Sequence, residues 1–168
     1  MKIFLIGFMG CGKSTLGKKL ASRMGYEFID LDHQIEKEIG STIANYFSAH
    51  GEAVFRSQES KTLKEFDYPE NCVVATGGGT PCFFDNMDWI NNNGISIYIE
   101  LPPVVLAQRL ESGKDKRPLL RDLHGDALVA FIAGKLGERS NYYQQCQFTI
   151  SGISLTADDL KSLLLTAE

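Results

Sequence analysis

The chain has 168 residues, 43% of them hydrophobic and 23% charged, which is ordinary for a globular protein and excludes collagen, coiled coil and wholesale disorder. Its 17 basic and 21 acidic residues leave a net charge of −4, so a general nucleic-acid binder is a poor interpretation. The longest apolar stretch, from Ile3 to Cys11, is too short for a transmembrane helix and lacks a signal-peptide cleavage pattern, so we expect a cytoplasmic protein without a membrane partner.

Short apolar runs alternate with helical segments along the chain. Five runs are predicted strands: residues 2–7, 28–31, 72–76, 95–101 and 147–151. Apolar residues at helical spacing predict helices over residues 13–24 and 127–143. This alternation is typical of an α/β fold in which helices cover both faces of a parallel sheet, and ligands then bind at the carboxyl ends of the strands. Without repeats or linkers, we expect one domain over residues 1–168.

Two stretches interrupt the simple alternation. Residues 32–66 hold several helices between the second and third strands, and we expect them to form a small lobe that faces the substrate. Residues 112–125 are polar, basic and bounded by glycines, and a loop of that length favours a mobile lid over a plain solvated connector.

The first strand is followed by a complete phosphate-binding motif. Residues 7–14 match G-x-x-x-x-G-K-[ST], and an amphipathic helix follows them. Glycines let backbone N–H groups approach phosphate oxygens, while Lys13 offers a charge to the β- and γ-phosphates and Ser14 a hydroxyl to Mg²⁺. Cys11 is expected to be a small filler in this loop. The motif therefore predicts binding of a nucleoside triphosphate.

Acidic and basic side chains follow the motif. Asp30 and Asp32 end the second strand and could both face the cleft, although Asp32 could instead only cap the next helix. Arg56 has acids at i−4 and i+3, which is consistent with a surface ion-pair network or with a rigid guanidinium that holds a carboxylate.

Glycines and further arginines complete the candidate set. Gly77, Gly78 and Gly79 follow the third strand, where a close approach to the backbone or a plain turn would explain them. Arg117 lies in the expected lid and could close over phosphates. Arg139 shares the apolar stripe of its helix, so it must be paired in a salt bridge or point into a cleft.

Together these residues resemble the shikimate kinase family. The matching segments occur in family order and reach from residue 1 to about 150: 7–15, 28–32 with 35–36, 51–59, 75–79, 117–120 and 138–142. The resemblance implies a three-layer αβα P-loop NTPase fold with a five-stranded parallel sheet in the order 2-3-1-4-5. It implies ATP-dependent phosphorylation of the shikimate 3-hydroxyl on the way to chorismate and the aromatic amino acids, by an enzyme that we expect to be a monomer.

The resemblance also implies roles for individual residues. Asp32, Arg56, Gly77 to Gly79 and Arg139 would contact shikimate, with Phe47 and Phe55 as walls of its pocket. The ATP phosphates would meet Gly10, Cys11, Gly12, Lys13, Ser14, Thr15 and Arg117; Ser14 would bind Mg²⁺, and Asp30 would do so through water. Catalysis would fall to Lys13, Asp32, Arg117 and Arg139. Where members often carry an arginine that stacks on adenine, the chain has Leu110, so no adenine contact is carried over.

Other interpretations remain open at this stage. A gluconate-type or nucleotide kinase could share the layout, and a non-catalytic ATP-sensing module could keep the phosphate motif alone. The four cysteines have no zinc-type spacing, so reduced thiols are expected in place of a metal site: Cys11, Cys72, Cys82 and Cys146.

Overall fold

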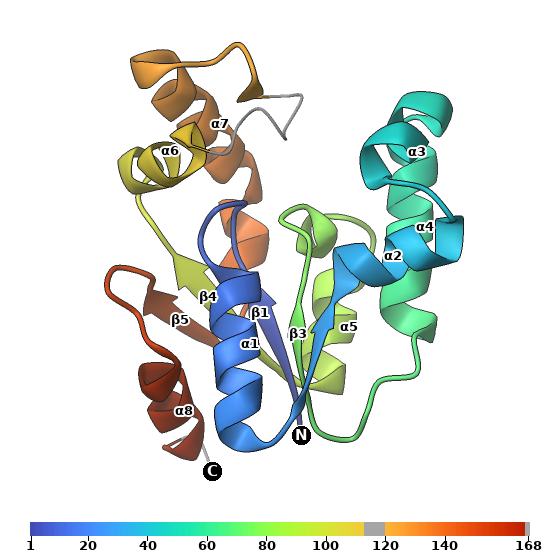
Figure 1. The fold of residues 1–168 in the computed structure, drawn as a ribbon, viewed down its shortest axis with the longest axis vertical. Helices are drawn as coiled ribbons and strands as arrows, with labels where there is room; N and C mark the ends of the chain where they lie inside the picture. Colours follow the sequence, from blue (N-terminus) through green and yellow to red (C-terminus); the bar gives the residue numbers. More distant parts are fainter. Residues whose placement is uncertain (113–119, 167–168) are drawn as a thin grey trace.

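A five-stranded parallel sheet forms the centre of the computed structural model, which describes residues 1–112 and 120–166 (Figure 1). The strands lie in the order β2-β3-β1-β4-β5, as predicted. Their bounds are β1 (Lys2–Ile6), β2 (Glu27–Asp30), β3 (Cys72–Ala75), β4 (Ile95–Glu100) and β5 (Phe148–Ser151). Each differs from its predicted range by a residue or less at either end.

Helices cover both faces of the sheet, which explains the continuous apolar runs. Ile3 and Leu5 of β1 point to one core cluster, and Phe4 and Ile6 point to the other. The first cluster is completed by α1 (Lys13–Met24), α6 (Pro103–Glu111) and α8 (Ala157–Leu165). The second is completed mainly by α4 (Glu52–Glu65) and α5 (Asn86–Asn93), and α7 (Gly125–Tyr143) contributes to both. A strand buried on both faces cannot alternate apolar and polar residues.

The chain between β2 and β3 forms three packed helices, as expected from its length. They are α2 (Leu31–Ile39), α3 (Ile43–His50) and α4. Gly40 ends α2 and Gly51 separates α3 from α4, each with a positive φ. In Figure 1 this group stands on one side of the carboxyl edge of the sheet, while α6 and α7 stand on the other.

One detail departs from the sequence-based expectations. The second strand ends at Asp30 and α2 begins at Leu31, because the Asp30 carboxylate accepts the His33 backbone N–H and caps the helix. Asp30, not Asp32, is therefore the capping residue. Residues 113–119 of the expected lid, Arg117 among them, lie outside the described residues. No helix within 1–112 or 120–166 has the length and apolar character needed to cross a membrane.

Candidate active site

The phosphate-binding loop joins β1 to α1 at the carboxyl edge of the sheet. Gly10 and Gly12 adopt φ values of 81° and 102°, which side chains with a Cβ rarely tolerate. The Lys13 side chain is buried, and its ammonium donates to the carbonyls of Gly7, at 2.7 Å, and Phe8, at 3.1 Å. The loop therefore holds a positive charge next to the N-terminus of α1, where anions are favoured.

Ser14 and Asp30 form a hydrogen-bonded pair of oxygen-bearing side chains beside this loop. The Ser14 hydroxyl donates to Asp30 Oδ2 at 2.9 Å. Within the described part of the chain, no group of three or more His, Cys, Asp or Glu side chains could by itself hold a metal. A hydroxyl and one carboxylate fit Mg²⁺, which keeps several waters and takes further oxygens from substrate phosphates.

Asp32 lies in the first turn of α2 and faces the same cavity as the loop. The cavity has a volume of about 420 Å³ and is lined by Met9, Gly10, Gly12, Lys13, Ser14, Thr15, Asp30, Asp32, Thr76, Gly77 and Gly78. The prediction that both carboxylates face the cleft is confirmed, although a helix turn rather than the alternation of a strand places Asp32 there.

Burial among other acids raises the pKa of Asp32. Loss of hydration is the main cause, and the nearby carboxylates of Glu59 and Asp30 add to it, so the pKa rises from 3.8 to about 6. Asp32 still borders the open cavity, and water reaches it. At neutral pH the group is mainly a carboxylate, whose oxygens can accept hydrogen bonds from the hydroxyls of a ligand.

We expect Asp32→Asn to stabilise the protein at pH 8. Between pH 4 and 6 the folded protein keeps a proton that the unfolded chain releases, so the free energy of unfolding falls as pH rises through this window. Because water screens the carboxylate, the contribution is expected to be about 1 kcal/mol, well below the full value of the shift. Urea unfolding at pH 4 and pH 8 measures it. An identical pH dependence in both proteins would contradict the assignment.

The three glycines after β3 are each approached closely by a side chain. A Cβ on Gly77 would lie 2.8 Å from Thr80 Oγ1 and 3.0 Å from Asp32 Oδ1. A Cβ on Gly78 would lie 3.3 Å from Arg139, and one on Gly79 would lie 2.6 Å from the Arg56 guanidinium. The close approach predicted for this segment is confirmed, and Asp32, Arg139 and Arg56 each lie against one of three consecutive glycines.

Arg56 is held in place from several sides. It pairs with Glu59 at 2.8 Å and Glu52 at 3.5 Å, and its guanidinium lies 4.3 Å from the centre of the Phe83 ring. Glu59 is buried and also accepts from Thr80 at 2.7 Å. The predicted ion pairs of Arg56 therefore exist, and they fix its guanidinium beside Gly79. That this guanidinium holds a carboxylate stays a prediction.

Arg139 extends from α7 towards the phosphate-binding loop. Its guanidinium lies 5.3 Å from the centre of the Phe8 ring, and it has no salt bridge with another residue of the described chain. One helical turn further, the Tyr143 hydroxyl donates to the Gly78 carbonyl at 2.5 Å. The helix thus supplies an available cation and a support for the glycine segment.

Phe47 and Phe55 lie together on α3 and α4. Their ring centres are 5.7 Å apart, with Phe55 buried and Phe47 exposed. Neither residue lines the 420 Å³ cavity. Arg56 and Arg139 do not line it either. Arg139 lies beside Gly78, which is part of the lining, and Arg56 lies beside Gly79, the next residue.

Sequence reasoning overlooked three residues that shape the site. Arg109 donates to the carbonyls of Cys11, at 3.3 Å, and Gly152, at 3.5 Å, whereas Leu110 is buried under Gly10. The arginine of α6 therefore reaches the loop from position 109. In the sequence, Glu59 is only the acid three residues after Arg56, and Tyr143 is only the last residue of the helix predicted over residues 127–143.

One edge of the sheet thus holds the phosphate-binding loop, two carboxylates and several cationic side chains. This combination of fold and site defines a P-loop kinase, which uses ATP to phosphorylate a small molecule.

The comparisons with known proteins define the family. The shikimate kinase family model matches residues 9–165, so the chain belongs to the shikimate kinase family. A shikimate kinase of Bacteroides fragilis is 43% identical over 148 residues, which is 88% of this chain and 83% of that protein.

Solved structures agree with the sequence comparison. The crystal structure of shikimate kinase from Bacteroides thetaiotaomicron has a TM-score of 0.92 at 39% identity and covers 98% of both chains. Shikimate kinase from Acinetobacter baumannii in complex with shikimate has a TM-score of 0.88 at 32% identity, covering 99% of this chain and 94% of that one.

Proposed function

We propose that this kinase transfers the γ-phosphoryl group of ATP to the 3-hydroxyl of shikimate, giving shikimate 3-phosphate and ADP on the route to chorismate and the aromatic amino acids. The observation that carries the proposal is the position of Arg56 and Arg139 against Gly79 and Gly78. The preceding residue, Gly77, is approached by Asp32, and Asp32 and Lys13 line the same cavity. Two guanidinium groups suit one carboxylate, and Asp32 suits the adjacent hydroxyls of a compact ring.

The proposed roles follow from these positions. Arg56 and Arg139 hold the substrate carboxylate, while Asp32 orients the attacking hydroxyl and accepts its hydrogen bond. Lys13 and the backbone from Gly10 to Thr15 hold the ATP phosphates, and Arg109 borders the same loop. We place Phe47 and Phe55 at the wall of the shikimate site, because Phe55 precedes Arg56 on α4.

Mg²⁺ belongs to the proposal as well. Ser14 would hold it directly and Asp30 through water, and the ion would neutralise charge on the β- and γ-phosphates. We further propose that residues 32–66 act as the substrate-binding lobe and 112–125 as a lid that brings Arg117 to the phosphates. We also propose that the enzyme is a monomer of the cytoplasm, and its four free thiols fit a reducing compartment.

A coupled assay of ADP release over a panel of acceptors tests the function. Shikimate should be turned over, while gluconate and nucleoside monophosphates should not. Turnover of gluconate without turnover of shikimate would overturn the proposal in favour of a sugar-acid kinase. If Asp32→Ala left ATP binding and every measurable activity unchanged, a non-catalytic ATP-sensing module would replace it.

Tyr143→Phe is expected to raise the KM for shikimate about fivefold. This factor corresponds to the loss of one neutral hydrogen bond, which contributes about 1 kcal/mol. The variant removes the donor to the Gly78 carbonyl, while its ring still packs on Tyr98, whose ring centre is 5.0 Å away. The KM for ATP should not change. Initial rates with each substrate varied in turn measure both constants, and equal effects on the two would contradict a role confined to the glycine segment.

A further inference from the structure

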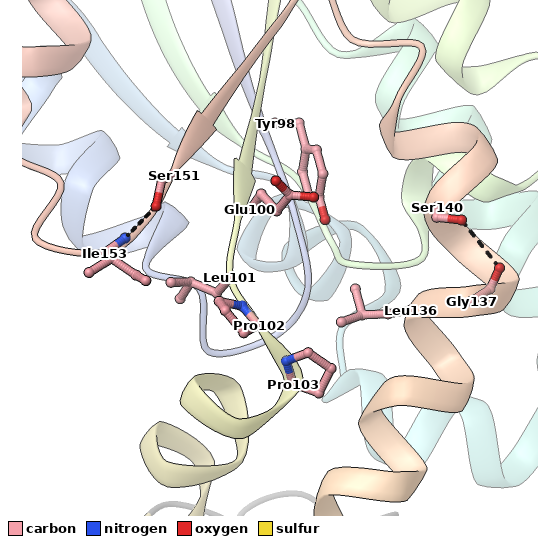
Figure 2. A pocket seen from close by; sticks show the side chains of 10 residues that line it. All are labelled: Tyr98, Glu100, Leu101, Pro102, Pro103, Leu136, Gly137, Ser140, Ser151 and Ile153. Atoms are coloured by element: carbon pink, nitrogen blue, oxygen red, sulfur yellow. Dashed lines mark hydrogen bonds between the residues drawn. The ribbon is translucent and has the colours of Figure 1, made fainter.

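A second cavity lies beside α7, at the carboxyl ends of β4 and β5 (Figure 2). It has a volume of about 430 Å³ and is lined by Tyr98, Glu100, Leu101, Pro102, Pro103, Leu136, Gly137, Ser140, Ser151 and Ile153. None of these residues lines the cavity of the phosphate-binding loop. The proposed function assigns nothing to this place.

Most residues that line this cavity are apolar, and one of them, Glu100, is acidic. Leu101, Pro102 and Pro103 form the wall from the end of β4, and Leu136 faces them from α7 (Figure 2). Among the residues that the structure describes, Glu100 is its only ionisable acid or base apart from the Tyr98 phenol, and no lysine, arginine or histidine of that part of the chain lines it. A phosphate or carboxylate ligand would therefore meet a repelling charge and no cation.

Glu100 and Tyr98 offer unused polar atoms to this space. The side chain of Glu100 is exposed, and it forms neither an ion pair nor a hydrogen bond with another residue that the structure describes. Tyr98 lies two residues earlier on the same face of β4, and its hydroxyl has no hydrogen-bond partner in the same part of the chain. Burial and the Glu100 charge raise the pKa of Tyr98 to about 12, so the phenol stays neutral.

We propose that this cavity is a binding site for a small organic cation, namely a primary amine with a compact apolar body. The ammonium pairs with Glu100 and hydrogen-bonds to the Tyr98 hydroxyl, while the body packs on Leu136 and the two prolines. Charge complementarity favours this occupant over a neutral molecule of the same shape, and the open backbone at Gly137 leaves room for it: a Cβ there would meet nothing within 4 Å.

Two packed tyrosine rings separate this cavity from the proposed substrate contacts. The Tyr98 ring packs on Tyr143, whose hydroxyl supports the Gly78 carbonyl. The cavity is nevertheless distinct from the substrate site, since Arg139, on the same helix, is directed to Phe8 instead.

The test uses 2-phenylethylamine as the probe and 2-phenylethanol as its neutral match. Each is titrated into the full-length isotope-labelled protein, and nuclear magnetic resonance follows the lining residues. The amine should bind with a millimolar dissociation constant, and the alcohol about threefold more weakly, as expected for an exposed ion pair. Glu100→Gln should weaken binding of the amine by the same factor. Glu65 is an exposed acid on α4, and Glu65→Gln should leave binding of the amine unchanged.

A matched pair of glycine variants tests whether the amine binds in this cavity or elsewhere on the surface. Gly137→Leu places a side chain in the cavity and should weaken binding of the amine at least tenfold. Gly134→Leu makes the same change one turn earlier on α7, also in open space but outside the lining, and should leave binding unchanged. Both variants should fold, because leucine favours a helix more than glycine does.

Three results would overturn the proposal. They are equal affinity for the amine and the alcohol, full binding to Gly137→Leu, and displacement of the amine by shikimate or by a non-hydrolysable ATP analogue. The last result would assign the cavity to the catalytic site. The outcome is independent of the acceptor assay, since binding is measured without turnover.

Discussion

Lys13→Ala is expected to lower kcat about a thousandfold or more. The ammonium of Lys13 is buried in the phosphate-binding loop and held by the carbonyls of Gly7 and Phe8, so it is positioned before ATP arrives. A fixed charge beside the transferring group stabilises the negative charge of the transition state, and losses of this size follow when such a donor is removed. Rates of ADP release at saturating shikimate and ATP measure the effect.

Two further variants show whether the charge itself is responsible. Lys13→Met keeps the length of the side chain without its ammonium, so it should be as inactive as alanine. Lys19→Ala removes a lysine from the exposed face of the same helix and should leave kcat unchanged. Circular dichroism should show a folded protein in each case. More than a tenth of the wild-type kcat in Lys13→Met would contradict the role.

Arg56→Lys is expected to raise the KM for shikimate between about tenfold and a hundredfold. A guanidinium can place two N–H groups on one carboxylate, and a charged hydrogen bond of that kind contributes about 1.5–3 kcal/mol. An ammonium is a single point that cannot reproduce both contacts, and at position 56 it would also lose part of the pairing with Glu59 and the packing on Phe83. Steady-state kinetics with shikimate varied at saturating ATP measure the change.

The control for Arg56→Lys is Arg23→Lys. Arg23 is half exposed on α1, where it pairs with Asp158 far from the cavity. Its replacement should leave both KM values unchanged. An unaltered KM for shikimate in Arg56→Lys would remove Arg56 from the carboxylate contacts, while a parallel increase in the KM for ATP would indicate a general distortion of the site.

Sequence patterns predicted the sheet well because its signal is strong. The runs of β1, β3 and β4 are apolar on both faces, as expected for strands of a parallel sheet that helices cover on both sides. The signal in the sequence is weaker for the boundary between β2 and α2. Residues 30–32 fit both the alternation of a strand and the start of a helix, and the helix begins at Leu31 because Asp30 caps it. Because Asp30 caps α2, Asp32 lies in the first turn of this helix and not in a strand. It lines the cavity from that position, as predicted.

Contacts between distant segments could not be read from the sequence. The bond from Tyr143 to Gly78 spans 65 positions, and nothing in the spacing of either residue indicates the other. Arg109 and Leu110 are neighbours on one helix, so only the rotation of α6 decides which side chain reaches the loop. The glycine segment was recognised as unusual, but the identity of the groups that approach it required the fold.

The crowding around the glycine segment also limits how the enzyme can change under selection. At Gly77 and Gly79 an added methyl group would come within 2.8 Å of Thr80 and 2.6 Å of Arg56, respectively. An inhibitor anchored to the backbone of these residues would therefore face a surface at which single substitutions also damage the enzyme.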